Sequence, residues 1–140
     1  MPSLSFKKQF APAVRAGLAV RAAGREPFLG EAVKLQTIRF SPRRQYKAGD
    51  QLHMFTGMRQ ARCERLGVAV CRSVQSIAIN PSAGAVELQK AGVRMPLFED
   101  EIEELARADG FADAKAFFAF FNAEAECSGV VWLAGQLIKW

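Results

Sequence analysis

The chain has 140 residues, half of them hydrophobic, which predicts a single domain over residues 1–140 with a sizeable core. Its apolar runs are far too short to cross a bilayer, and residues 1–10 lack the apolar segment of a signal peptide. We therefore expect a soluble cytoplasmic protein that contacts no membrane. One histidine and three cysteines without a Cys-x-x-Cys pair argue against a zinc site, and we expect no metal, no cofactor and buried, reduced thiols.

The charge is divided unevenly along the chain. Residues 1–72 hold 14 Lys and Arg against 4 Asp and Glu, whereas residues 73–140 hold 5 against 10. A basic half is typical of a protein that binds nucleic acid or another polyanion. The alternative is that the two halves neutralise each other across the fold.

The first third of the chain predicts a helix and a loop. Residues 6–17 carry apolar side chains at helical spacing, and Pro12 suits a first helical turn. Residues 18–23 extend this helix to Gly24, a typical C-terminal stop. Residues 25–33 contain proline and glycine and predict a loop.

Strands dominate the centre and the end of the chain. They are predicted over residues 34–40, 51–56, 66–79, 85–90, 129–133 and 136–140. The apolar alternation changes parity within the third of these, which predicts a bulge near residues 75–76. Basic residues at 41–44 and the segment 47–50 predict turns, and Gly135 is expected to bend the last strand.

Two more helices precede the final strands. Residues 98–109 follow amphipathic spacing with an acidic first turn, and Gly110 ends them. Asp113 is a suitable cap for a second helix over residues 114–123, where Phe120 lies off the apolar stripe and is either exposed or part of a second contact. Too few helices separate the strands for a doubly wound sheet. The sequence therefore predicts an α+β fold, a small mixed or antiparallel β-barrel with peripheral helices.

The strand at residues 34–40 carries the most suggestive polar pattern. Alternation places Thr37 and Arg39 on one face, while Ile38 and Phe40 take the core face. Lys34 lies where the strand begins and can turn to the same side as Thr37. A lysine, a hydroxyl and a guanidinium together suit an anion or a polar planar ligand.

Several short segments along nearly the whole chain match one family in order: residues 6–17, 34–39, 48–50, 56–59, 63–70, 106–111 and 136–140. They resemble the ASCH domain, a branch of the PUA-like barrels, and most closely its small stand-alone members from bacteria and bacteriophages. Two departures stand out. Ala32 replaces the usual glycine of a Gly-x-Lys motif, and residues 18–33 are inserted between helix and strand, where they extend the helix, cover the cleft or crowd it.

The resemblance implies RNA-related binding, and some small bacterial members hydrolyse acetylated cytidine. Their chemistry falls on a lysine, a threonine and an acidic residue, which match Lys34 as base, Thr37 as nucleophile and, with Asp in place of Glu, Asp109 as acid. The alternative is structural: threonine favours strands, lysine and arginine solvate sheet edges, and Asp109 simply ends a helix.

Three functions remain open. The first is binding of RNA or a modified nucleoside in a basic cleft, for which the candidate residues are Lys34, Thr37, Arg39, Arg43, Arg44, Tyr46 and Arg59. The second is an amidohydrolase that acts on an N-acylated cytidine. The third is a protein-binding accessory factor, which would expose a patch of Phe120, Trp132 and Trp140 and close its cleft with residues 18–33.

Overall fold

The computed structural model describes residues 2–28, 30–40, 44–58 and 61–140. Within these ranges the helices are η1, a 3-10 turn (Lys8–Phe10), α1 (Ala11–Ala22), α2 (Glu99–Ala108) and α3 (Ala114–Ser128). The strands are β1 (Ser3–Phe6), β2 (Gln36–Arg39), β3 (Gln51–Thr56), β4 (Glu64–Val70), β5 (Ser73–Asn80), β6 (Ala85–Lys90), β7 (Val93–Pro96) and β8 (Leu133–Lys139).

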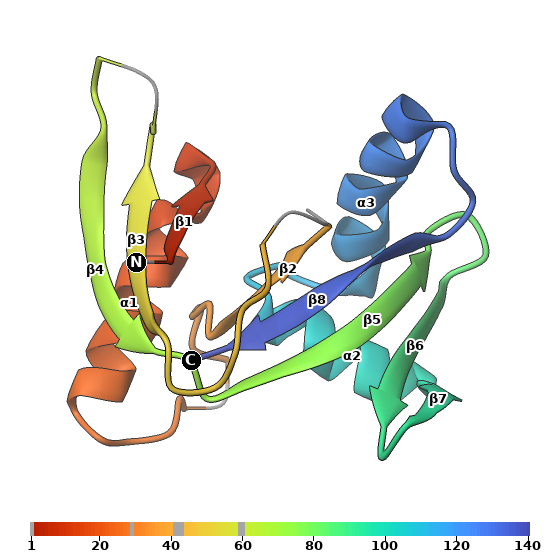
Figure 1. Cartoon of the computed structure of the whole chain (residues 1–140), viewed down its shortest axis with the longest axis horizontal. Coiled ribbons are helices and arrows are strands. Elements are labelled where there is room, and N and C mark those ends of the chain that lie inside the picture. Colours follow the sequence, from red (N-terminus) through yellow and green to blue (C-terminus); the bar gives the residue numbers. More distant parts are fainter. Residues whose placement is uncertain (1, 29, 41–43, 59–60) are drawn as a thin grey trace.

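The strands form two sheets, which diverge in Figure 1. One has the order β1-β3-β4, with β1 parallel to β3, and the other is the antiparallel sheet β2-β8-β5-β6-β7. The α+β class predicted from the sequence is confirmed. The hydrogen bonds between the described strands do not close into one ring.

The chain passes from one sheet to the other between β4 and β5. Cys71 donates its N–H to Asp50 O at 2.8 Å, and the next residue, Arg72, donates to Lys139 O at 2.7 Å in the second sheet. The prediction of one strand with a bulge near residues 75–76 is wrong, because β5 keeps an unbroken register with β8. The parity of the apolar residues changes because β5 contacts both cores: Val74 packs against the smaller one, whereas Ile77 and Ile79 belong to the larger one.

The N-terminal prediction of a helix from residue 6 is also wrong. Leu4 and Phe6 are buried by alternation in β1, which pairs with β3 although about fifty residues separate the two strands. The helix begins at Ala11, with Pro12 in its first turn as predicted, and continues to Ala22. Apolar spacing alone cannot distinguish a strand from a helix here, because the positions of Phe6 and Phe10 are compatible with either structure.

The C-terminal third follows its local signals more closely. Asp113 Oδ1 accepts a hydrogen bond from Ala116 N at 2.8 Å and caps α3, as predicted, although α3 continues to Ser128. Gly135 does not bend the chain, and β8 runs through it. A side chain there would meet Arg39 O at 2.3 Å, so this glycine is needed for close pairing with β2.

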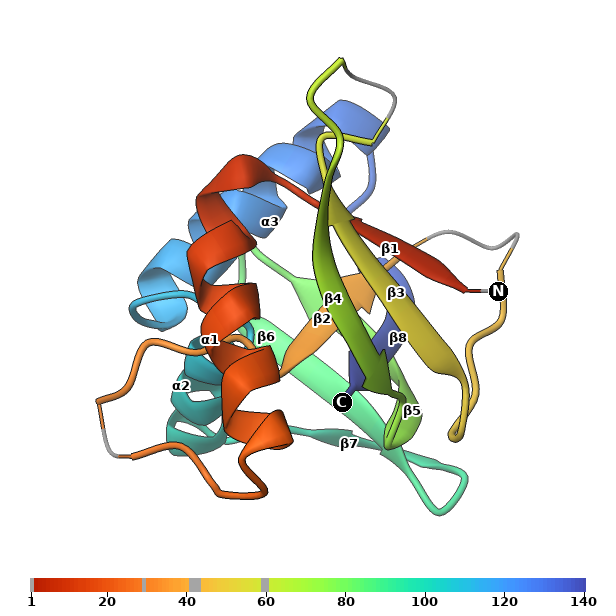
Figure 2. The ribbon, with the colours of Figure 1, turned by 90° about the vertical axis from the view of Figure 1, so that its left-hand side faces the viewer.

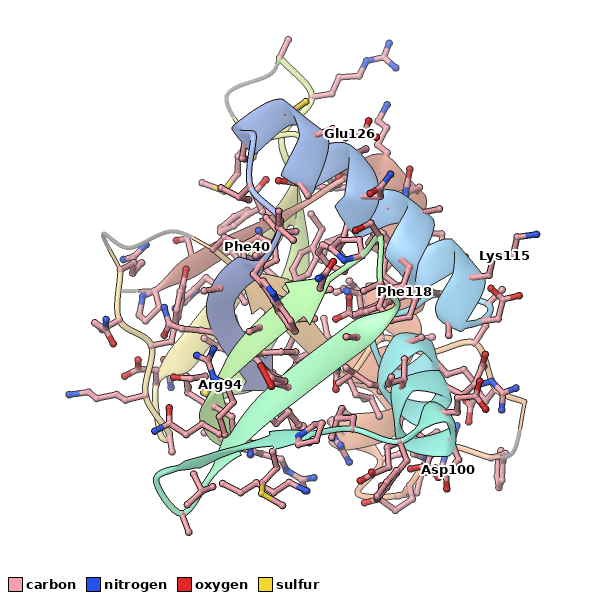
Figure 3. All side chains as sticks on the ribbon, turned by 90° about the vertical axis from the view of Figure 1, so that its right-hand side faces the viewer. Phe40, Arg94, Asp100, Lys115, Phe118 and Glu126 are labelled. Carbon is pink, nitrogen blue, oxygen red and sulfur yellow. The ribbon has the colours of Figure 1, made fainter. Side chains whose placement is uncertain are left out.

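Two hydrophobic cores lie on either side of the junction between the sheets. The larger lies between the five-stranded sheet and the helices α2 and α3, where Figure 3 shows Phe118 between α3 and the sheet and Lys115 pointing away. The smaller joins β1, β3 and α1 to the buried ring of Trp140. Figure 2 shows α1 alongside β4, on the flank of the three-stranded sheet.

The cysteines differ from one another in exposure. All three are free, but only Cys71 is buried, whereas Cys63 and Cys127 are exposed, so the prediction of buried thiols is wrong for two of them. Both exposed cysteines lie near ends of secondary-structure elements, where neighbouring apolar residues do not imply burial. In the described part of the chain, no helix has the length and apolar character required to span a membrane.

Candidate functional site

A pocket of about 680 Å³ lies between the two sheets and α3. Lys34, Thr37 and Arg39 line it together with Asp109, which follows α2. The polar side chains predicted to converge from residues 34–39 are therefore at one pocket. Their roles in binding or catalysis stay predictions.

Lys34 is held in place through its backbone. Its N–H donates to Ala13 O in α1 at 2.9 Å, and the next residue, Leu35, donates to Ala108 O in α2 at the same distance. A Cβ on Gly17 would lie 2.1 Å from Lys34 O, so only glycine lets α1 approach this closely. Contacts with two helices therefore position the segment that leads into β2.

Lys34 and Asp109 form a buried ion pair at the base of the pocket. Lys34 Nζ lies 3.3 Å from Asp109 Oδ1, with the two side chains 4% and 3% exposed, and also donates to Asp109 O. Burial lowers the pKa of Lys34 and raises the pKa of Asp109, and the charge of each partner opposes the other's shift. Gly110, at φ +92°, packs against the lysine stem.

Arg39 lies on the same wall with its guanidinium carbon 4.9 Å from the centre of the Phe6 ring. Its Nε is buried and has no hydrogen-bond partner among the described residues, and the same holds for Asp109 Oδ1. Burial lowers the pKa of Arg39, while Tyr46 and Asp109 oppose this shift. The pocket therefore contains a donor and an acceptor that make no hydrogen bond within the described chain.

Aromatic rings make up much of the wall, and sequence reasoning did not assign them to the site. The lining rings are Phe6, Phe10, Phe40, Phe111, Phe120 and Phe121. Phe120, left open above, is half-buried and lies 5.6 Å from Phe10 and 5.4 Å from Phe111 between ring centres. Lys34 Nζ lies 4.9 Å from the centre of the Phe10 ring. The four-residue spacing of Phe6 and Phe10, and of Phe117 and Phe121, could have indicated an aromatic wall, but the packing of a helix against a core explains it equally well.

The remaining predicted binding residues lie elsewhere. Tyr46 donates from its hydroxyl to Ser3 O at 3.4 Å and packs against the smaller core. Arg44 is exposed, with its guanidinium carbon 6.0 Å from the Tyr46 ring, and neither residue lines the pocket. Arg43 and Arg59 lie outside the described residues, as does most of the turn predicted at 41–44.

The inserted segment extends the helix, one of the three alternatives for residues 18–33. Beyond α1, Arg25 forms a two-pronged ion pair with Glu31 at 3.0 and 2.9 Å. Of its residues that the structure describes, none lines the pocket, so no cover over the cleft is seen there. The patch expected for a protein-binding factor is not formed, because Trp140 is buried and Phe120 lines the pocket.

The chemistry of the pocket is that of polar organic recognition. It combines a buried ion pair, a threonine hydroxyl, an arginine and several aromatic faces. Over the described ranges, no three His, Cys, Asp or Glu side chains are grouped so that they could hold a metal ion. Comparisons of the chain with protein-family models, with curated proteins and with solved structures found no match.

Proposed function

We propose that this protein is an ASCH-like, PUA-like domain whose pocket binds the base of an RNA nucleotide or of a modified nucleoside. The observation that carries the proposal is the buried Arg39 Nε, which has no hydrogen-bond partner among the described residues and lines the same pocket as Asp109, the ion-pair partner of Lys34. A buried polar atom without a partner costs about 1–3 kcal/mol. An acceptor on a ligand would relieve this cost at Arg39, and a donor on the same planar edge could bind Asp109 Oδ1; nucleobase edges have this pattern.

The size and the walls of the pocket support the same ligand class. A volume of about 680 Å³ suits an organic molecule of nucleoside size. Among the lining rings, Phe40, Phe111 and Phe120 are half-buried and offer stacking surfaces for a base.

Binding measurements test the proposal directly. We expect isothermal titration calorimetry at low salt to detect binding of at least one member of a panel of common ribonucleosides and N4-acetylcytidine. Arg39→Met removes the unpaired donor and is expected to weaken binding at least about tenfold. Arg44→Met removes an exposed arginine outside the pocket and serves as the matched control. The proposal fails if no nucleoside and no short single-stranded RNA binds, or if the two variants weaken binding equally.

Hydrolysis of an acylated cytidine is the second candidate, favoured by the lowered pKa of Lys34 and by the presence of Thr37 in the same pocket. Neutral Lys34 would take the hydroxyl proton as Thr37 Oγ1 attacks the acyl carbonyl, and Arg39 would stabilise the oxyanion. The proton then passes to the departing exocyclic amine, which leaves as cytidine. Water hydrolyses the acyl-threonine ester and releases the carboxylic acid.

An isosteric substitution separates catalysis from binding. Thr37→Val is expected to abolish turnover of N4-acetylcytidine while its affinity falls less than about threefold, and Thr37→Ser is expected to retain turnover. Ser5→Ala removes an exposed hydroxyl on the same pocket and is the control. Hydrolysis by Thr37 is excluded if turnover persists in Thr37→Val, or if the wild type shows no turnover from pH 7 to pH 10. Binding is then the only function proposed for the pocket.

A further inference from the structure

The mouth of the pocket carries charges of both signs. Lys7 and Lys8 belong to the connection from β1 to α1, whereas Glu124 belongs to α3. All three are exposed and all three line the pocket. Across the described ranges none of them forms an ion pair, so their charges remain available to a ligand.

Lys7 has a defined position on this rim. Its Nζ lies 4.7 Å from the centre of the Phe120 ring, a cation–π contact that restricts the side chain. Phe120 and Glu124 are four residues apart on α3 and therefore lie on the same face of that helix. Lys7 therefore lies over Phe120, about one helical turn from Glu124, and all three residues line the pocket.

We propose that this rim makes the pocket specific for a phosphorylated ribose: Lys7 and Lys8 bind a phosphate ester, and Glu124 accepts a hydrogen bond from a ribose hydroxyl. The inference rests on the proposed function, since it takes the base to occupy the deep end of the pocket. The ligand is then a ribonucleotide, either a free mononucleotide or one unit of an RNA strand. The phosphate ester is common to both sources.

The geometry of a nucleotide explains why the two lysines and Glu124 would bind different groups of it. When the base lies against Arg39 and Asp109, the sugar and the phosphate attached to it must lie toward the mouth. A lysine offers three N–H donors and a positive charge to phosphate oxygens, and two lysines in succession offer them from one side. A carboxylate accepts from a ribose hydroxyl and repels a phosphate. The pair of charges therefore orients the nucleotide as well as binding it.

The 2′-hydroxyl is the group that distinguishes RNA from DNA at such a site. Because Glu124 can accept a hydrogen bond but cannot donate one when ionised, a hydroxyl is a partner and a deoxyribose carbon is not. We infer that Glu124 is a specificity-determining residue for ribose, while the two lysines determine the preference for a phosphorylated ligand.

Calorimetric titrations at about 50 mM salt test this with the tightest-binding nucleoside from the panel above. The probes are that nucleoside, its 5′- and 3′-monophosphates, the 2′-deoxy form of the tighter monophosphate, and a trinucleotide RNA. We expect the tighter monophosphate to bind at least about tenfold more strongly than the nucleoside in the wild type. Lys7→Gln/Lys8→Gln should remove this advantage and change nucleoside affinity less than about twofold. Glu124→Gln should reduce the preference for ribose over deoxyribose.

Lys115→Gln is the control for a lost positive charge, because Lys115 lies on α3 and points away from the sheet in Figure 3. The inference is supported if a monophosphate binds more strongly than the nucleoside and the double lysine variant removes this difference. It is supported equally if the trinucleotide binds more strongly still and the same variant removes that gain. The inference is overturned if the nucleoside binds and phosphate adds nothing, or if Lys115→Gln lowers affinity as much as the double variant. Either result leaves the proposed function intact, whereas failure of every nucleoside and nucleotide to bind overturns both.

Discussion

Lys34 Nζ lies 3.3 Å from Asp109 Oδ1, although 75 residues separate the two in the chain. Both side chains are almost fully buried, and each is surrounded by aromatic and aliphatic groups at the base of the pocket. A buried pair of this kind adds little net stability, because its attraction is offset by desolvation, yet loss of one partner leaves an uncompensated buried charge. The pair therefore links the folding of α2 to the position of Lys34.

The pair predicts strong coupling in a double-mutant cycle. Lys34→Met and Asp109→Leu are each expected to lower the free energy of unfolding by about 3–5 kcal/mol, because each leaves the opposite charge buried alone. The double variant should lose clearly less than the sum of the two. Urea unfolding at pH 7 measures all three. Arg107→Gln, which breaks an exposed pair with Glu103 at 3.7 Å, should cost no more than about 0.5 kcal/mol. Additive losses for the buried pair would contradict this account.

Gly17 predicts an unusual response to alanine. At an exposed position in a helix, alanine in place of glycine stabilises by about 1 kcal/mol. In α1 the new Cβ would lie 2.1 Å from Lys34 O, a backbone atom that moves only with its chain. We expect Gly17→Ala to destabilise the protein by about 3 kcal/mol in urea unfolding, as helix and strand are forced apart.

Ala19→Ser, at an exposed position of α1, is the control for this substitution and should change stability by less than about 0.5 kcal/mol. A gain of stability in Gly17→Ala would show that α1 does not lie this close to the segment before β2.

The exposure of the thiols predicts their reactivity. Cys63 and Cys127 are exposed, whereas Cys71 is buried and burial raises the pKa of its thiol. We expect an aromatic disulfide reagent at pH 8 to modify two thiols in the native protein and a third only after unfolding in guanidinium. Cys71→Ala should leave the native stoichiometry unchanged, whereas Cys63→Ser should reduce it to one. Three thiols that react at one rate in the native protein would contradict the burial of Cys71.

The loop after α1 predicts an acid-dependent contribution to stability. The hydrogen bonds from Arg25 and from Phe28 N lower the pKa of Glu31 from 4.5 to about 2. A carboxylate whose pKa is lower in the folded protein than in the unfolded chain stabilises the folded protein at any pH above the unfolded-chain pKa. This contribution is lost as the pH falls from 4.5 to about 2. The difference in melting temperature between the wild type and Glu31→Gln should therefore be present at pH 6 and shrink toward pH 2.

Glu104→Gln, an exposed carboxylate on α2, is the control for the change in net charge. A difference between the wild type and Glu31→Gln that is the same at both pH values would contradict the assigned cause.

Local signals predicted the elements that depend on local physics. β3 and β6 occupy the predicted residues 51–56 and 85–90, and α2 and α3 begin where acidic and capping residues indicated. β1 was missed because its strand pairing is with a segment some fifty residues away. The four-residue strand β7 was missed as well, since its side chains are exposed and give no periodic signal.

By itself, the sequence determined that the chain is α+β and that Thr37 and Arg39 share one face of a strand, because alternation along a strand is a local property of the backbone. The tertiary structure alone decided which groups face them: the phenylalanine walls, the distance from Lys34 to Asp109 and the charged rim of Lys7, Lys8 and Glu124. These contacts join segments from three helices and both sheets. Their geometry depends on how the packed cores orient those elements, which no local pattern in the chain encodes.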